Sequence, residues 1–290
     1  MSILSSLRYH LGLARAFGMP AAVSLGIRRK FGLRKPVTAR WQGQRVVVRP
    51  RESDPVVASS VLGWQEYALG ERAETALSRL AQKWHARGRT PVIIDGGANV
   101  GYAALHFAKL YPEAVIIAVE PNPETFDVLR QNCAGYPQIR PVLGALWSHD
   151  QGVSLQSDPE SSWSDRVHDG GLTPSFRLQD LLASVPNSRS LIIKLDIEGA
   201  EGEVCRAAPE VLRTTACLLI EPHDYLRPGA SVLSPVYDAL NGLQVDTLLV
   251  GEYIAVIASS LMREPVTEMV TVAAPAPSAM IAEAKLATAQ

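Results

Sequence analysis

The amino-acid sequence predicts an α/β protein built on a doubly wound, mostly parallel sheet. From Pro91 onward, short apolar runs alternate with helical stretches. Apolar strands that alternate with helices are typical of a parallel sheet with both faces covered. The last two runs, VDTLLV (245–250) and GEYIAVIAS (251–259), follow each other almost directly. They predict an antiparallel hairpin at the end of the sheet.

Charge and composition divide the chain into three parts. Residues 1–50 contain ten Lys or Arg and no Asp or Glu, although the net charge of all 290 residues is −1. The last residues, 264–290, are rich in Ala, Pro and Val. We therefore expect an N-terminal appendage of basic helix and β-hairpin over 1–60, a main domain over 61–262, and a disordered tail over 263–290.

The appendage is expected to begin with a helix. Apolar residues recur at three- and four-residue steps over 3–17, and Gly18 and Pro20 end the pattern. Basic residues crowd the following segment, so residues 1–35 could lie on an anionic membrane surface as a peripheral contact. Packing of the helix on its own domain, or a dimer contact, is the favoured alternative. A hairpin is predicted by VTARW (37–41) and RVVVRP (45–50).

The other elements follow in order. A helix is expected over 71–87, and further helices over 100–111 and 123–133. The polar segment 148–175, with Trp163 and His168, is expected to be a long loop after the third sheet strand. Such loops are often functional, and the alternative is a mobile surface excursion. The expected buried strands are 92–95, 114–120, 139–147, 191–198, 217–223 and 245–250.

The stretch IIDGGANVG (93–101) turns a strand into a helix. Its glycines allow backbone conformations and close approaches that a side chain would forbid. The dinucleotide fingerprint G-x-G-x-x-G fails, because Ala98 or Asn99 stands where its second glycine is needed, and no P-loop Gly-Lys-Ser/Thr follows. The turn therefore suits a ligand without a pyrophosphate, and Asp95 beside it favours a cationic ligand.

A second acid, Glu120, ends the next strand 25 residues after Asp95. A carboxylate at this position can accept hydrogen bonds from both hydroxyls of a ribose. Either acid alone could be an ordinary strand-end carboxylate. The glycines, the spacing and the strand context together favour an adenosine with a positively charged amino-acid tail, which is S-adenosylmethionine.

Two stretches of the chain resemble the FkbM family of methyltransferases. Residues 92–132 are similar to the first half of a class I methyltransferase and read VIIDGGANVGYAALHFAKLYPEAVIIAVEPNPETFDVLRQN. Residues 192–208, IIKLDIEGAEGEVCRAA, resemble the second signature of the FkbM family, and IEPHD (220–224) fits the same family. The resemblance implies a seven-stranded Rossmann-like sheet of the class I methyltransferase fold. It also implies S-adenosylmethionine as methyl donor and O-methylation of a sugar, glycolipid or natural product.

The resemblance also implies which residues contact the cofactor. Those at the methionine end are Asp95, Gly97, Asn99 and Gly101. The ribose is expected on Glu120, with Asn122 at the rim, and the adenine near Gly144, Ala145 and Leu146.

The segment LDIEGAE (195–201) is expected to carry the chemistry. A hydroxyl needs a proton acceptor, and Asp196 is the first candidate for this general base. His223 is the second, because histidine is a good base near neutral pH. Together with Glu221, these residues could form a hard-metal site. Three such side chains on neighbouring strand ends are weak grounds for an ion, so no metal is expected.

Composition indicates the cellular compartment and the class of partner. The three cysteines lack metal-like spacing and fit a reducing compartment, so a cytoplasmic location with membrane association left open is expected. The net charge gives no field that selects nucleic acid, so the expected partner is a small-molecule or glycan acceptor. The oligomeric state is left open.

Two rival functions remain. The first is a nicotinamide-dependent oxidoreductase, which the broken glycine fingerprint disfavours. The second is a non-catalytic partner protein on a methyltransferase fold, which the presence of Asp95, Gly97 and Glu120 disfavours.

Overall fold

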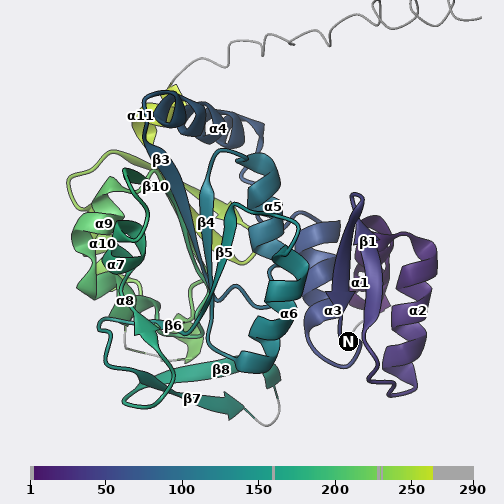
Figure 1. Cartoon of the computed structure of the whole chain (residues 1–290). Coiled ribbons are helices and arrows are strands. Elements are labelled where there is room, and N and C mark those ends of the chain that lie inside the picture. The colour runs from purple at the N-terminus through teal and green to yellow at the C-terminus, as the bar shows by residue number, and fades with distance from the viewer. Residues whose placement is uncertain (1–2, 159–160, 227–228, 230, 264–290) are drawn as a thin grey trace, which may run out of the picture.

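The computed structural model describes residues 3–158, 161–226, 229 and 231–263. Its centre is a seven-stranded sheet in the order β12-β13-β11-β10-β3-β4-β5 (Figure 1). Within it, β13 runs antiparallel to both of its neighbours, and the other paired strands are parallel. The predicted mostly parallel sheet with a terminal hairpin is therefore confirmed. The strands are β3 (Thr90–Gly96), β4 (Val115–Glu120), β5 (Ile139–Leu143), β10 (Ser188–Leu195), β11 (Cys217–Ile220), β12 (Val245–Val250) and β13 (Tyr253–Ala258).

Helices cover both faces of this sheet. Alternate residues of one strand point to opposite sides, so Ile93 belongs to one apolar core while its neighbours Val92 and Ile94 belong to the other. The first core is closed by α4 (Glu71–Ala86), α5 (Tyr102–Leu110) and α6 (Pro123–Cys133). The second is closed by α7 (Leu178–Ala183), α8 (Glu201–Ala207), α9 (Pro209–Thr214) and α10 (Ser234–Leu240). This is the doubly wound, Rossmann-like class I methyltransferase fold that the family resemblance implies.

The N-terminal residues form a layer that packs on the first core (Figure 1). Helix α1 (Ile3–Phe17) contacts the π-helix η1 (Ala58–Gly63), where the Ser59 hydroxyl donates to the carbonyl of Tyr9 at 3.0 Å. A Cβ on Gly63 would lie 2.2 Å from the carbonyl oxygen of Gly12, so the two backbones touch. The expected packing of this helix on its own chain is thus present. The layer also contains β1 (Val37–Trp41), β2 (Gln44–Val48) and α3 (Asp54–Val57), and the strands form the predicted hairpin.

A second N-terminal helix, α2 (Met19–Lys30), was not predicted. Gly18 adopts a φ of 81° and turns the chain between α1 and α2. Pro20, which reads as a terminator, lies in the first turn of α2, where the missing N–H of proline costs no helical hydrogen bond.

The segment 148–175 is not the loop that its polarity predicts. It forms an antiparallel hairpin of β7 (Val153–Asp158) and β8 (Ser161–Asp169), and short strands β6 (Ala145–Leu146) and β9 (Ser175–Phe176) pair beside it. Val153 and Val167 are buried under this hairpin, which explains why it is ordered as strands. His168 is exposed, and the side chain of Trp163 lies outside the described part of the structure.

The described part of the chain ends with α11 (Ser259–Arg263). The tail expected to be disordered, 263–290, lies outside the described residues except for Arg263. The expected division at residues 60 and 262 stays a prediction. Among the described helices, none combines the length and the apolar composition that crossing a membrane requires.

Candidate functional site

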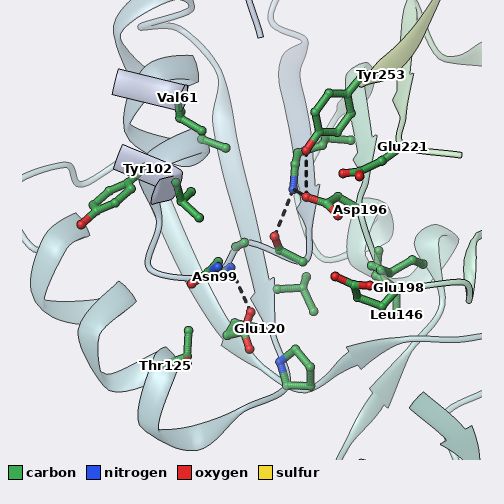
Figure 2. Close-up of a pocket in the computed structure, with 18 of the residues that line it drawn as sticks. Val61, Asn99, Tyr102, Glu120, Thr125, Leu146, Asp196, Glu198, Glu221 and Tyr253 are labelled. Carbon is green, nitrogen blue, oxygen red and sulfur yellow. Dashed lines mark hydrogen bonds and ion pairs between the residues drawn. The ribbon is translucent and has the colours of Figure 1, made fainter. Parts of the chain in front are cut away.

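The carboxyl ends of the central strands surround a cavity of about 560 Å³ (Figure 2). Parallel strands bring their carboxyl ends to one edge of the sheet, which is where ligands bind in such folds. Nine of the eleven residues predicted to bind the cofactor or to act as the base line this cavity. They are Gly97, Asn99, Glu120, Asn122, Gly144, Ala145, Leu146, Asp196 and His223.

Asp95, one of the two exceptions, lies beneath the cavity. It is fully buried, and the Lys194 Nζ lies 3.1 Å from its Oδ1 atom. The same ammonium donates to the carbonyls of Gly96 and Gly97 at 3.1 and 3.0 Å. The Asp95–Lys194 pair therefore holds the glycine turn from below. A direct contact of Asp95 with a ligand stays a prediction.

Gly101, the other exception, packs two helices together. Its φ is +88°, and a Cβ there would lie 2.9 Å from the Cys133 Sγ atom on α6. The glycine lets α5 begin close against α6. Gly101 does not line the cavity, and its contact with the cofactor stays a prediction.

The turn itself depends on Gly97. Its φ is +69°, and a Cβ at this position would lie 1.8 Å from the carbonyl oxygen of Asp196. No side chain fits there, so the ends of β3 and β10 can approach each other only with glycine. Asn99 has a φ of +49°, a region that Asn tolerates better than most residues.

Glu120 is fixed in the cavity wall by the backbone. Its Oε2 atom accepts a hydrogen bond from the amide of Asn99 at 2.9 Å (Figure 2). Its Oε1 atom accepts one from the amide of Asn122, also at 2.9 Å. The side chain of Asn122 caps α6 by accepting from the amides of Glu124 and Thr125. Both predicted residues thus have defined orientations at the end of β4.

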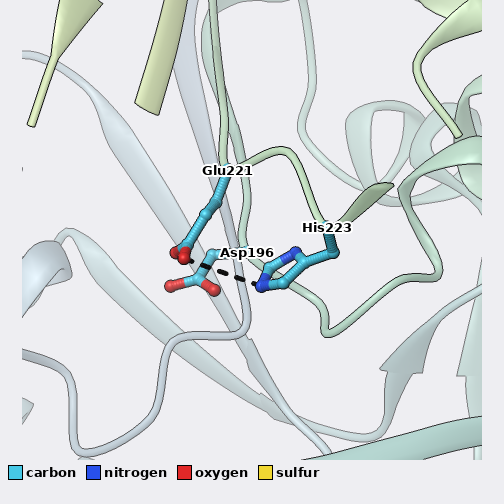
Figure 3. A group of neighbouring side chains, drawn as sticks. All are labelled: Asp196, Glu221 and His223. Carbon is cyan, nitrogen blue, oxygen red and sulfur yellow. Dashed lines mark ion pairs between the residues drawn. The ribbon is translucent and has the colours of Figure 1, made fainter. Parts of the chain in front are cut away.

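Asp196 and Glu221 lie next to each other at the ends of β10 and β11 (Figure 3). The Asp196 Oδ2 atom accepts from the Tyr253 hydroxyl at 2.9 Å and lies 3.5 Å from the Lys194 Nζ. Burial opposes ionisation of Asp196, but Lys194 and Tyr253 outweigh it and hold its pKa below the usual value. Burial and the charge of Asp196 raise the pKa of Glu221 to about 8. The two carboxyls therefore have different affinities for a proton.

His223 is oriented by a buried carboxylate. Its Nδ1 atom lies 2.8 Å from the Oε1 atom of Glu201, which also accepts from the amides of Ile197 and Gly199. The Nε2 atom points toward Glu198 and Glu221, each 3.7 Å away. Burial opposes a charge on the ring, but Glu201 and the other carboxylates raise the pKa of His223 to about 9. A ring that is already protonated at neutral pH is poorly suited to be the general base.

The same cluster could hold a hard cation. Asp196, Glu221 and His223 each offer a ligand atom, and these atoms lie within 4.8 Å of one another (Figure 3). The chain supplies a competing cation, because Lys194 already lies beside Asp196. The expectation that no metal is used stays a prediction.

Several cavity residues were not foreseen. Lys194 interrupts the apolar run LIIKL, and a charged residue inside a buried strand was the available signal. The hydroxyls of Tyr253 and Tyr67 form a hydrogen bond of 3.0 Å, which extends the hydrogen-bonded chain that begins at Asp196. Val57, Ser60 and Val61 line the cavity from α3 and η1, a segment with no sequence signal for a site.

The described cavity lining is strongly acidic. Lys194 is its one lysine or arginine, whereas six carboxyl groups face the same space. Burial and the neighbouring acids raise the pKa of Glu66, as expected where like charges are crowded. The six are Glu66, Glu120, Asp196, Glu198, Glu221 and Glu252.

Known methyltransferases are similar to the part of the chain that forms this cavity. Residues 95–231 match the family model for the methyltransferase FkbM domain. Methyltransferase 1 of Beauveria bassiana is 28% identical over 143 residues, which cover 39% of this chain and 57% of that protein. Hexuronic acid methyltransferase AglP of Haloferax volcanii is 28% identical over 141 residues, covering 47% and 58%. The 2-O-methyltransferase NoeI of Sinorhizobium fredii is 24% identical over 177 residues, covering 53% and 73%.

The matches cover a little more than half the length of the first two relatives. The range matched by the family model includes the glycine turn, Glu120 and the cluster of Asp196, Glu221 and His223. Residues 95–231 therefore match a methyltransferase FkbM domain, in agreement with the resemblance of the sequence motifs.

Proposed function

We propose that this protein is an S-adenosylmethionine-dependent methyltransferase that methylates a hydroxyl of a sugar, glycolipid or natural product. The observation that carries the proposal is the Glu120 carboxylate, which two backbone amides hold at the end of β4. Each of its oxygens accepts one of these bonds and keeps acceptor capacity for a ribose hydroxyl. The match of residues 95–231 to a methyltransferase domain supports the same activity.

The acidic cavity supports this cofactor over a dinucleotide. S-adenosylmethionine carries a sulfonium and an ammonium but one carboxylate, so its net charge is positive. A nicotinamide dinucleotide would bring an anionic pyrophosphate into a space lined by six carboxyls. We expect the methionine end at Gly97 and Asn99, and the adenine beside Ala145 and Leu146.

The acceptor is expected on the side of Glu221 and Tyr253. The names of two relatives, a hexuronic acid methyltransferase and a 2-O-methyltransferase, support a sugar-like hydroxyl as the acceptor. Tyr225 borders the cavity on this side with most of its side chain exposed, and an aromatic ring there could stack on a sugar.

We assign the proton acceptor to Glu221 and not to Asp196, the first candidate from the sequence. A carboxylate with a raised pKa binds a proton more tightly, whereas the low pKa of Asp196 makes it a weak base. Asp196 then serves to raise the basicity of Glu221. Methyl transfer is an in-line displacement, so positioning of the two reacting atoms contributes much of the rest.

Calorimetry on Glu120→Ala tests the cofactor. Loss of two charge-assisted hydrogen bonds, roughly 1.5–3 kcal/mol each, should weaken S-adenosylmethionine binding by at least about 100-fold. Glu124→Ala is the matched control, because Glu124 is an exposed glutamate four residues further along the chain, in the first turn of α6. Its affinity should equal that of the wild type.

Calorimetry also measures the binding of NADH to the wild-type protein. Unchanged S-adenosylmethionine affinity in a folded Glu120→Ala protein, or tight NADH binding by the wild type, would refute the assignment.

A further inference from the structure

The outer face of α2 carries an unpaired apolar stripe. Met19, Val23, Ile27 and Phe31 follow each other at four-residue steps from α2 into its C-cap, so they share one side of the helix. Their exposed fractions are 64%, 52%, 50% and 70%. The inner residues Ala22 and Leu25 are buried and already attach α2 to the protein. The stripe is therefore not needed for the core, and α2 lies at the outer edge of the molecule (Figure 1).

Basic residues surround the stripe. Lys30, Arg34 and Lys35 are exposed at the end of α2 and just after it. Arg28 and Arg29 donate to the carbonyls of Lys35 and Glu52, so their charge meets no carboxylate in these bonds. The sequence has no Asp or Glu before residue 52, and none of the ion pairs found in the described residues involves a residue before Arg49.

We propose that α2 and residues 31–35 dock on an anionic lipid surface. A helix that combines exposed apolar side chains with flanking Lys and Arg buries the former at the headgroup boundary and places the latter beside anionic headgroups. A second copy of the chain would bring the same positive charge against itself. Nucleic acid would attract the charge but would leave the apolar stripe in water.

Docking would also orient the rest of the protein. Helix α2 is joined to α1, and α1 packs on η1, whose Ser60 and Val61 line the cavity. The lipid surface would therefore be attached to a wall of the site through directly packed elements. The docking proposal does not depend on which reaction the site performs.

Co-sedimentation with vesicles tests the proposal on the full chain. At low salt the protein should sediment with phosphatidylglycerol–phosphatidylcholine vesicles and not with phosphatidylcholine alone. In Arg34→Gln/Lys35→Gln, binding should fall about 30-fold, since each basic side chain near an anionic surface contributes about 1 kcal/mol. In Ile27→Gln/Phe31→Gln it should fall at least about tenfold.

Matched controls separate docking from general stickiness. Arg87→Gln/Arg89→Gln removes two exposed charges elsewhere, and Leu249→Gln removes a leucine that is 84% exposed on β12. Both should bind vesicles like the wild type, and every variant should keep its melting temperature. The proposal is overturned if the wild type ignores anionic vesicles at low salt, or if the α2 variants bind unchanged. It is equally overturned if light scattering shows a dimer that Ile27→Gln/Phe31→Gln dissociates, because the stripe is then covered by a second copy.

Discussion

At the scale of single residues, the surroundings of Asp196 and Glu221 shift their pKa values in opposite directions. Burial opposes ionisation of both carboxyls, but Lys194 and Tyr253 outweigh it at Asp196, whereas the charge of Asp196 adds to it at Glu221. The sequence identifies both carboxylates at strand ends, but it cannot rank their basicity. That ranking depends on Lys194 and Tyr253, which lie 2 and 57 residues from Asp196 in the chain and meet it only after folding.

The assignment of Glu221 predicts a pH profile. A carboxyl group accepts a proton only when ionised, so turnover should rise with pH toward the pKa of about 8. Glu221→Gln should lose about 10²–10⁴-fold in turnover, with little change in S-adenosylmethionine affinity. The measurement is initial rate against pH, with an acceptor found by screening hydroxylated sugars and lipids. A Glu221→Gln protein with full activity would show that Glu221 is not the base.

Asp196→Asn separates the two candidates. Removal of its negative charge should lower the pKa of Glu221, so the rise in turnover should move to lower pH while activity remains. If Asp196 is itself the base, the variant will be inactive at every pH. The melting temperature serves as the control, since Asp196 also binds Tyr253 and lies beside Lys194.

At the scale of elements, the sheet is predictable and the N-terminal layer is less so. Runs such as VIID and AVIIAVE are apolar up to their last residue, a pattern typical of a strand that is covered on both faces. The hairpin of β7 and β8 was missed because most of its residues are polar, and among its described side chains the buried ones are Val153 and Val167. Helix α2 was missed because Pro20 marks a helix start as readily as an end.

A buried histidine on helix α5 predicts that the folded protein loses stability at acid pH. His106 is almost fully buried there, and burial lowers its pKa to about 4. The unfolded chain takes up a proton near pH 6.5 and the folded chain does not, so stability is lost as pH falls from about 6.5 to about 4. The loss should reach about 3 kcal/mol, because one pKa unit corresponds to about 1.4 kcal/mol.

Urea unfolding at several pH values measures this loss. His106→Leu should unfold with a weaker dependence on pH in this window, whereas His85→Leu, a change at an exposed position, should keep the wild-type dependence. Equal slopes in wild type and His106→Leu would mean that other groups cause the acid sensitivity.

At the scale of the whole molecule, the chain itself places a cationic side chain beside the carboxylates that could hold a metal ion. Lys194 lies beside both Asp95 and Asp196, and His223 lies among Glu198, Glu201 and Glu221. We therefore expect methyl transfer without a metal ion, so dialysis against EDTA should leave turnover unchanged. Activity that disappears with EDTA and returns with Mg²⁺ or Mn²⁺ would instead assign an ion to Asp196, Glu221 and His223.

The contact between Gly12 and Gly63 limits where this protein can be divided. The two backbones touch, and the apolar core runs without interruption from Leu13 and Leu25 through Trp41 to α5. Sequence composition suggests a cut near residue 60, but a fragment that starts there would expose that core and free η1 from its support. For truncation libraries, crystallisation fragments and chimaeras with related enzymes, the N-terminal helices and the cavity wall behave as one exchangeable unit.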